Sequence, residues 1–237
     1  MQKQHFYMLL SNSLIAIMLL SLSVLTFLDP VKSVVNQEAY KVYYNGNLNS
    51  KNVSLMMNVY WGNEYLDDIL NVFAEYDIKT TFFVGGVWVN KFNEDFLKIV
   101  NKGHEIGNHG YFHKSQDSLN YQQNQDEILS THKLVKSLCG VNMSLFAPPG
   151  GAYGDETLQV AKNLGYSTVM WTRDTIDWRD QDANLIFDRE IKNLKGGDLV
   201  LMHPTKASVC ALPLIIDFIK SQGFNIVTVS ENIKDGA

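Results

Sequence analysis

Short apolar runs alternate with longer amphipathic segments from Val53 to near the end of the chain. Runs such as TTFFVGG (80–86) and YSTVMWT (166–172) are rich in β-branched and aromatic residues, as buried strands are. Between them, segments such as 63–76 place apolar residues at helical spacing. Strands that alternate with helices form a parallel sheet with right-handed crossovers. The sequence therefore predicts an α/β fold, and about seven such units favour a distorted (β/α) barrel of parallel strands over an open, doubly wound sheet.

The same periodicities assign the individual elements. We expect strands at 53–61, 80–86, 104–110, 144–151, 166–172, 198–203 and 224–230. We expect helices at 63–76, 93–103, 124–138, 154–165, 183–195 and 211–223. Glycine or proline ends several of these segments, which is typical of element boundaries.

Residues 6–28 contain no charged side chain. An α-helix needs about 20 such residues to cross a bilayer core. Lys3 precedes the run and Asp29 follows it, so the positive-inside rule places the rest of the chain outside the cell. A cleaved signal segment is the alternative, with VKS (31–33) as its cleavage site. We therefore expect an anchor or signal segment at 1–28, a linker at 29–51 and the barrel domain at 52–237, in a single-pass protein of the cell membrane or in a secreted one.

The overall composition excludes some functions. The formal net charge is −5, whereas a protein that binds nucleic acid needs a basic face. Cys139 and Cys210 are the only cysteines, too few for a disulfide framework, and neither belongs to a metal-binding or redox motif. We expect a monomer that binds no nucleic acid.

The stretch HEIGNHGYFH (104–113) holds three of the chain's six histidines. His109 and His113 are spaced H-x-x-x-H, and imidazole is the commonest protein ligand of zinc and similar metals. A catalytic zinc site takes three protein ligands and leaves one position for water, so this pair needs a further partner. Hydrogen-bonded histidines that hold no metal are the alternative interpretation.

Polar residues gather where the predicted strands end, together with glycines and prolines, which favour unusual backbone conformations. In a (β/α) barrel the active site lies at the carboxyl ends of the strands. The residues at those ends are Asn58 to Trp61, Gly85, Gly86, His109, His113, Pro148, Pro149, Gly150, Asp174, Asp177, Trp178 and His203. Each alone fits an ordinary turn, but together they predict one site that can bind a metal and transfer protons.

Five segments, TTFFVGG, GHEIGNHGYFH, FAPPGG, WTRDTIDW and LVLMH, resemble those of the polysaccharide deacetylases, the NodB-type domain of carbohydrate esterase family 4. The resemblance covers the chain from about Val53 to its end. It implies a distorted (β/α) barrel and a metal-dependent hydrolase that removes N-acetyl, or sometimes O-acetyl, groups from a cell-envelope glycan such as peptidoglycan or chitin. It also implies a divalent metal, zinc in the first place, with cobalt, manganese or nickel as alternatives.

The resemblance assigns roles to individual residues. His109 and His113 match the metal ligands of the family. His203 matches the general acid, and Asp177 matches the carboxylate that orients it. These roles are consistent with the hydrolysis of an N-acetyl group, because a metal polarises the amide carbonyl while a histidine protonates the leaving amine.

The resemblance also implies how the substrate is held. Trp178 and Leu201 match the walls of the acetyl pocket, and Pro148 and Pro149 match the family's proline motif beside the substrate. Tryptophan and leucine suit a pocket just large enough for a methyl group.

The first motif of the family, T-F-D-D-G, is altered in this chain. The matching stretch is MMNVYWG (56–62), where Asn58 replaces the aspartate that acts as the base. Val59, or Tyr60 if the alignment shifts by one, replaces the aspartate that binds the metal, and Ala147 replaces the arginine that orients the base. An amide cannot accept a proton at neutral pH, but its carbonyl oxygen can bind a hard cation.

Two hypotheses from different classes follow. The first is a metal-dependent deacetylase in which Glu64 or Asp174 supplies the missing carboxylate. The second is a non-catalytic protein that binds glycan or serves as a scaffold at the cell envelope, since a fold does not imply an activity. The structural alternative for Glu64 is an acid that favours the first turn of a helix, and for Asp174 a carboxylate that braces its turn.

Overall fold

The computed structural model describes residues 4–5, 7, 13–15, 17–18 and 40–234. The chain divides into two units, Met1–Ala39 and Tyr40–Ala237, and the fold given below is that of the second. Most of the expected anchor or signal segment, 1–28, lies outside the described residues. Among the residues that are described, no helix is long and apolar enough to span a membrane.

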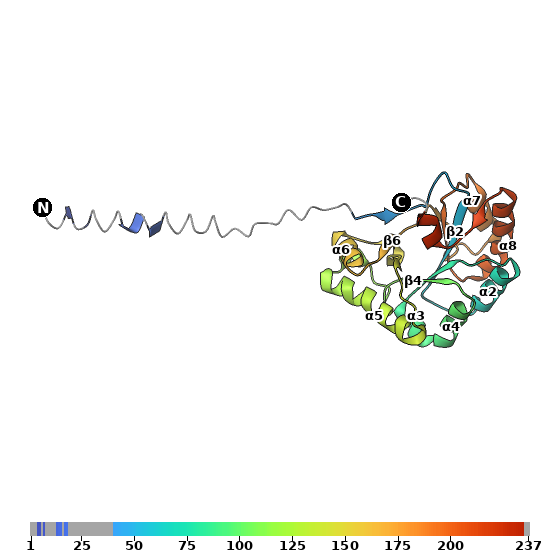
Figure 1. The fold of residues 1–237 in the computed structure, drawn as a ribbon, viewed down its shortest axis with the longest axis horizontal. Helices are drawn as coiled ribbons and strands as arrows, with labels where there is room; N and C mark the ends of the chain where they lie inside the picture. The colour runs from blue at the N-terminus through green and yellow to red at the C-terminus, as the bar shows by residue number, and fades with distance from the viewer. Residues whose placement is uncertain (1–3, 6, 8–12, 16, 19–39, 235–237) are drawn as a thin grey trace. The chain divides into compact units, whose positions relative to one another are not determined.

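A parallel sheet forms the centre of the second unit (Figure 1). Its strand order is β1-β6-β5-β4-β3-β2-β8-β7, with β9 paired to β2, and every one of these pairings is parallel. The strands are β1 (Val42–Tyr43), β2 (Asn52–Val59), β3 (Thr81–Val84), β4 (Glu105–Asn108), β5 (Leu145–Phe146), β6 (Ser167–Val169), β7 (Arg173–Asp174), β8 (Leu199–Met202) and β9 (Asn225–Ile226). The predicted distorted (β/α) barrel is confirmed. In the described part of the chain no pairing joins β1 to β7, so the barrel is open there.

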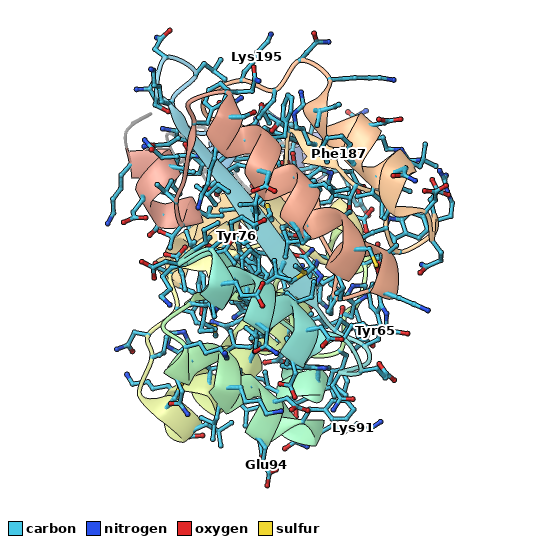
Figure 2. The ribbon with its side chains drawn as sticks, turned by 90° about the vertical axis from the view of Figure 1, so that its right-hand side faces the viewer. Tyr65, Tyr76, Lys91, Glu94, Phe187 and Lys195 are labelled. Carbon is cyan, nitrogen blue, oxygen red and sulfur yellow. The ribbon has the colours of Figure 1, made fainter. Side chains whose placement is uncertain are left out.

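Helices alternate with the strands and pack on the outside of the sheet. They are α2 (Leu66–Glu75), α3 (Gly86–Lys91), α4 (Asn93–Asn101), α5 (Tyr121–Cys139), α6 (Asp155–Asn163), α7 (Ala183–Ile191), α8 (Lys206–Ser221) and α9 (Val229–Lys234). The longest, α5, begins with a capping box between Asn120 and Gln123 and ends at Gly140, whose φ of 75° closes the helix. Figure 2 looks onto α8 and α2, which contact each other and lie in front of β2.

Strand β2 shows how the sheet separates two cores. Val53, Leu55, Met57 and Val59 pack in the layer under the helices, whereas Met56 packs with Leu201 and other apolar residues inside the barrel. This alternation is the two-residue period of a strand. Asn58 follows the same period, so its side chain faces the interior at the end where β2 stops.

Part of the expected linker, 29–51, joins the sheet. Its first residues, 29–39, lie outside the described residues, but β1 pairs with β6 through Val42 and Thr168. Gly46 donates its backbone N–H to the carbonyl of Gly197 at 2.8 Å. A β-carbon at Gly196 would lie 1.8 Å from the carbonyl oxygen of Ser50, so this close approach requires glycine.

The last predicted strand, 224–230, is shorter than expected. Strand β9 ends at Ile226, and α9 begins at Val229. The Thr228 hydroxyl accepts the backbone N–H of Glu231, whose carboxylate accepts the backbone N–H of Thr228. These reciprocal bonds start a helix inside a β-branched run, because capping overrides the strand preference of Val and Thr.

Candidate active site

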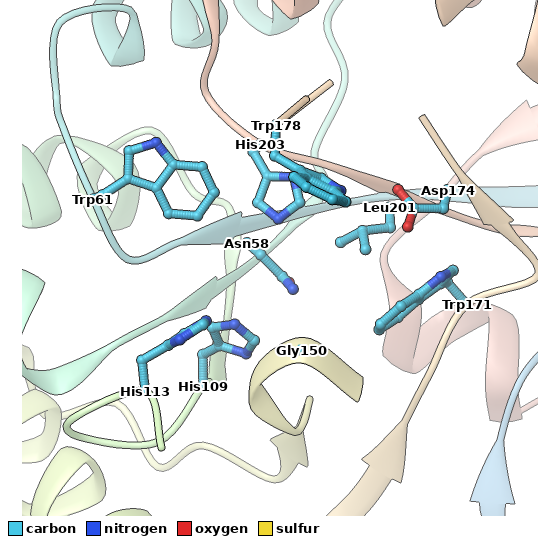
Figure 3. Close-up of a pocket in the computed structure, with 10 residues that line it drawn as sticks. All are labelled: Asn58, Trp61, His109, His113, Gly150, Trp171, Asp174, Trp178, Leu201 and His203. Carbon is cyan, nitrogen blue, oxygen red and sulfur yellow. The ribbon is translucent and has the colours of Figure 1, made fainter. Parts of the chain in front are cut away.

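The carboxyl ends of the strands enclose a cavity of about 310 Å³ (Figure 3). Its lining comes from six connections that lie far apart in the sequence. The lining residues are Asn58, Trp61, His109, His113, Gly150, Trp171, Asp174, Trp178, Leu201 and His203. The barrel therefore brings the predicted histidines, Asn58 and both expected pocket walls together at one end, as parallel topology requires.

The loop that carries the two histidines is fixed by side chains from outside the cavity. Asn108, at the end of β4, accepts the backbone N–H of Gly110 at 2.9 Å. The buried carboxylate of Glu127 on α5 accepts the backbone N–H groups of Tyr111 and Phe112 at 2.8 and 2.7 Å. Backbone amides bound by a buried carboxylate form strong, charge-assisted hydrogen bonds, so the loop is held rigidly.

His109 presents one free ring nitrogen to the cavity. Its Nδ1 lies 2.7 Å from the carbonyl oxygen of Ala147, which can only accept, so Nδ1 carries the proton and Nε2 is an acceptor. Burial, together with the neighbouring His113 and His203, lowers the pKa of His109 to about 3. His109 is therefore neutral at physiological pH, which is the form that ligates metals.

His113 lies against an aromatic ring. Its imidazole stacks on Tyr60 with a centroid distance of 4.1 Å, and its centroid lies 5.0 Å from that of His109. Burial also lowers the pKa of His113. Tyr60 thus packs on this imidazole, and its hydroxyl donates to the carbonyl of Phe112 at 3.4 Å.

Asn58 is the buried polar group at the centre of the cavity, pointing between the histidine pair and His203 (Figure 3). The residue is only 4% exposed, and its Oδ1 has no hydrogen-bond partner in the described part of the chain. The following residue, Val59, is fully buried in the outer core, so it offers no ligand to the cavity. An unpaired buried amide oxygen is costly, by roughly 1–3 kcal/mol, and such atoms mark places where a ligand completes the bonding.

The donors in the cavity fit a divalent metal only in part. Two imidazoles, from His109 and His113, and the side-chain amide of Asn58 face the same space, with the amide nitrogen of Asn58 at the tip that Figure 3 shows in the cavity. Within the described residues, no group of three or more His, Cys, Asp or Glu side chains could hold a metal ion. A catalytic zinc site uses three protein ligands of these types, so the set here is one ligand short.

His203 and Asp177 form the second functional pair. His203 Nδ1 donates to Asp177 Oδ1 at 2.7 Å, and the His203 backbone N–H donates to Oδ2 at 2.6 Å. The hydroxyl of Ser208, at the start of α8, donates to the same Oδ2. Asp177 is fully buried, so the pair leaves only Nε2 of His203 to act in the cavity.

Two residues beside the site adopt a left-handed backbone. His113 has a φ of 55° and Ile176, next to Asp177, has a φ of 53°. A β-branched residue such as isoleucine rarely takes this conformation, which costs about 1–3 kcal/mol. Asp174 holds the turn because its Oδ1 accepts the backbone N–H of Ile176 at 2.8 Å. The surrounding bonds therefore stabilise the strained turn that places Asp177.

Apolar side chains form the remaining walls. Leu201, Trp171 and Trp178 line the cavity, and Gly150 lines it after β5. Pro148 and Pro149 are buried and do not belong to the lining. These walls suit a small apolar group such as the methyl of an acetyl substituent.

The two carboxylates proposed as alternative bases lie in different places. Asp174 lines the cavity, although one of its oxygens braces the turn before Asp177. Glu64 is exposed and lines a neighbouring hollow, not the cavity with the histidines. Its Oε2 accepts the backbone N–H of Asn63 at 3.0 Å. The structure therefore does not bring Glu64 to the reacting centre.

Several contributing residues had no role in the sequence interpretation. Glu127 and Ser208 support the two functional pairs from helices α5 and α8. Trp171 lines the cavity, and its place near the end of the predicted strand 166–172 is the one signal that could have identified it. Trp61, already expected among the strand-end residues, stacks on His203 with a centroid distance of 5.0 Å. Glu127 and Ser208 lie within ordinary helical sequence and carry no signal.

An α/β barrel whose strand ends bring a histidine pair and a histidine–aspartate pair to one small cavity has the layout of a hydrolytic site. The family model for polysaccharide deacetylases matches residues 45–169. The chain belongs to the polysaccharide deacetylase family.

Two relatives show the range of the family. YlxY, an uncharacterised protein of Bacillus subtilis, is 35% identical over 188 residues, which make up 79% of this chain and 59% of that protein. The chain thus spans less than two thirds of that relative. A peptidoglycan-N-acetylglucosamine deacetylase of Bacillus cereus is 32% identical over 176 residues, 72% of this chain and 82% of that enzyme.

A solved structure with a similar fold belongs to a protein described as a pseudoenzyme. It is a carbohydrate esterase family 4 protein of Bacillus anthracis, with a TM-score of 0.81 and 34% identity over 84% of this chain and 71% of that one. A mutant of it, described as having restored enzymatic activity, matches with a TM-score of 0.81 and 32% identity over 84% of this chain and 74% of that one.

Proposed function

We propose that this protein binds an acetylated amino sugar of a cell-wall glycan of the peptidoglycan type, and that it hydrolyses the acetyl group weakly or not at all. One observation carries the proposal. The position of the family's base holds Asn58, a buried amide that cannot take a proton from water. The similarity to a pseudoenzyme and to peptidoglycan deacetylases supports both halves of this proposal.

The walls of the cavity account for the binding. The acetyl methyl group packs against Leu201, Trp171 and Trp178, where it is shielded from water. The Nε2 atom of His203 hydrogen-bonds the polar part of the acetamide, because Asp177 fixes the orientation of the ring. The side-chain amide of Asn58, which reaches into the cavity, hydrogen-bonds the acetamide of the ligand.

The residues that would hold a metal are His109 and His113, with the oxygen of Asn58 as a neutral third donor. A bound divalent ion supplies a Lewis acid that polarises the acetyl carbonyl. Since the donor set is one ligand short, the binding proposed here depends on the chain's own hydrogen bonds and apolar contacts.

A second candidate function is a slow deacetylase. The intact pair of His203 and Asp177 favours it, because that pair retains the group that protonates the leaving amine. Asp174 is the only carboxylate of the cavity lining within the described residues, and it would serve as the base.

Binding and hydrolysis can be separated in one experiment. Calorimetry measures the affinity for N-acetylated chito-oligosaccharides, with fully deacetylated oligomers as the control, while acetate release is measured from the same oligomers and from peptidoglycan. Acetyl-dependent binding without acetate release supports the binding function. Acetate release that is lost in His203→Ala and in Asp174→Ala supports the slow deacetylase. An absence of both binding and release contradicts both functions.

We also propose that the domain acts outside the cytoplasmic membrane as a monomer, since the glycan lies there. The uncharged run 6–28 supports an exported protein, either anchored or cleaved. Cell fractionation should find the full-length chain in the membrane with the domain open to external protease. A soluble product that begins near Val34 would indicate cleavage.

A further inference from the structure

We infer that Tyr60 and Trp61 are positioning residues, which hold the imidazoles of His113 and His203 in place by stacking, so that the acetamide site is already formed without a metal. The two aromatic residues are neighbours in the altered first motif, and each packs on a different histidine of the cavity. The inference rests on the proposed binding function, because it states how the cavity that binds the acetamide keeps its shape.

Tyr60 covers one face of the His113 imidazole. The ring centroids are 4.1 Å apart and the planes are inclined by only 21°, which is a stacked arrangement. Within residues 40–234, no other residue hydrogen-bonds the His113 ring, whereas the carbonyl of Ala147 orients His109. The contact with Tyr60 is also the closer of the two ring contacts of His113, the other being with His109 at 5.0 Å. Stacking on Tyr60 therefore fixes the orientation of this imidazole.

The position of Tyr60 is itself well determined. Tyr60 directly follows β2, and Gly85 directly follows β3, the strand that pairs with β2. A β-carbon at Gly85 would lie 2.9 Å from Cδ2 of Tyr60, so the tyrosine ring packs directly on this glycine. The hydroxyl at the other end of the ring bonds the carbonyl of Phe112, the residue before His113. These contacts hold the ring where it can support the imidazole.

Trp61 packs on His203 in the same way. The ring centroids are 5.0 Å apart and the planes are inclined by 26°. Figure 3 shows the indole beside His203, across the cavity from the histidine pair. The next residue, Gly62, has a φ of 62°, and its carbonyl accepts a hydrogen bond from Nε1 of the buried Trp88 at 2.6 Å. This bond anchors the loop that carries Trp61, so the indole is held against the imidazole.

Tyr60 separates positioning from ligand contact, because it does not belong to the cavity lining. It can affect a bound acetamide only through His113, which does line the cavity. An imidazole that rotates freely must be ordered when a ligand binds, and the lost freedom weakens binding. A stacked aromatic ring provides that order in advance. The binding cavity should therefore be formed in the protein alone.

The test measures ring order and affinity in the same proteins. Nuclear magnetic relaxation of the imidazole C–H groups gives the order of His113 and His203 in the presence of EDTA and without ligand. Calorimetry gives the affinity for N-acetylglucosamine in EDTA and in added zinc. The variants are Tyr60→Ala, Tyr60→Phe and Trp61→Ala. The matched control, Tyr121→Ala, removes a half-buried tyrosine of α5 outside the cavity.

Tyr60→Ala should lower the order of His113 and leave that of His203 unchanged, and Trp61→Ala should do the reverse. Tyr60→Phe keeps a stacking ring, so both imidazoles should stay as ordered as in wild type. Wild type should bind N-acetylglucosamine as tightly in EDTA as in zinc. Tyr60→Ala should bind it about two- to twelvefold more weakly in EDTA, because binding must then order one more side chain. Tyr60→Phe and Tyr121→Ala should bind it like wild type.

Three results would overturn the inference and leave the proposed function standing. They are unchanged order of His113 in Tyr60→Ala, a loss of order in Tyr121→Ala as large as in Tyr60→Ala, and binding by wild type that requires added zinc. Trp61 is 44% exposed, so Trp61→Ala keeps the core and tests the support of His203 by itself. If the sugar binds in neither EDTA nor zinc, the proposed function fails, and the order of the two imidazoles still decides whether the aromatic residues position them.

Discussion

His203 and Asp177 are joined twice, from imidazole Nδ1 to Oδ1 at 2.7 Å and from the His203 backbone N–H to Oδ2 at 2.6 Å. The pair links the end of β8 to the loop between β7 and α7, because Asp177 belongs to that loop. The carboxylate is fully buried, so only its hydrogen-bond donors compensate its charge. The same contact therefore orients the imidazole and stabilises the fold around it.

Replacing Asp177 by alanine should destabilise the protein strongly. The change leaves the ring nitrogen and backbone N–H of His203 and the hydroxyl of Ser208 without their acceptor, and each buried donor left unsatisfied costs about 1–3 kcal/mol. Ser208→Ala removes one donor and should cost about 1.5–3 kcal/mol. Urea unfolding measures both free energies. Equal losses in the two variants would contradict a central role for the carboxylate.

Asn58→Asp should create or raise deacetylase activity. The new carboxylate stands in the cavity opposite His203 and supplies the missing base, which typically contributes ~10²–10⁴-fold. The gain should fall short of a full family site, because Ala147 provides no arginine to orient it. Acetate release from N-acetylated chito-oligosaccharides with added zinc or cobalt is the measurement.

The double variant Asn58→Asp/His203→Ala is the matched control for that gain. It keeps the new base and lacks the group that protonates the leaving amine, so it should release acetate at the wild-type rate or below. Full activity in the double variant would refute the role of His203 as the acid.

The order of strands and helices could be predicted because burial imposes periodicity. Strand β8, predicted at 198–203, is Leu199–Met202, and helix α4, predicted at 93–103, is Asn93–Asn101. Four short elements, β1, β7, α3 and α9, could not be predicted. β1 has two residues, and its pairing with β6 depends on contacts far along the chain. α9 begins in a β-branched run because of a local cap that outweighs the strand preference.

The cavity could be predicted in outline because parallel strands end on one side of a barrel. His109, His113, His203, Trp178, Leu201 and Asn58 line it together. The side chains that hold the residues of the cavity in place could not be predicted from the sequence. Glu127 reaches back to the loop of Tyr111, and Ser208 reaches Asp177, across 16 and 31 residues. Such hydrogen bonds depend on how the helices pack, and a short sequence motif does not predict helix packing.

His109 and His113 should bind a divalent metal together but loosely. Both imidazoles have a lowered pKa and are neutral at pH 7, while the third donor is a neutral amide. A ligand at 100 times its dissociation constant stabilises a protein by about 2.7 kcal/mol. Unfolding in increasing zinc or cobalt should therefore show a rising midpoint at high metal concentrations. Asn58→Asp should move this rise to lower concentrations.

The variant His109→Ala/His113→Ala tests the location of that metal. It should abolish the rise in the unfolding midpoint, whereas His132→Ala, on α5 and outside the cavity, should preserve it. A metal effect that persists in the double histidine variant would place the ion elsewhere.

Glu127→Gln should loosen the loop that carries the histidines. The substitution keeps the size of the side chain and removes the charge that strengthens its bonds to the backbone N–H groups of Tyr111 and Phe112. The expected loss in the free energy of unfolding is about 1–2 kcal/mol, the difference between charged and neutral hydrogen bonds. Amide exchange at Tyr111 and Phe112 should accelerate, and Glu156→Gln on α6 should change neither quantity. Unchanged exchange would show that the loop is held by other contacts.

His104 should make the protein less stable in acid. Its ring packs against Phe73 and Phe82, and Nδ1 accepts the backbone N–H of Thr80 at 3.2 Å. Burial, and then the charges of Lys79 and Lys102, lower its pKa to about 4, against about 6.5 in the unfolded chain. Between these two values the unfolded chain binds a proton that the folded protein excludes.

The stability due to a neutral His104 is therefore complete above about pH 6.5 and falls as the pH drops toward 4. His104→Gln cannot take up this proton. It should be less stable than wild type at pH 7, because a polar amide fits the two phenyl rings less well, yet lose less stability on acidification. Urea unfolding at several pH values from 7 to 4 gives, for wild type and for His104→Gln, the slope of the free energy of unfolding against pH. The carboxylates and His109 are present in both proteins, so the difference between the two slopes is due to His104. Parallel curves for wild type and His104→Gln would mean that His104 is protonated equally in the folded and unfolded states.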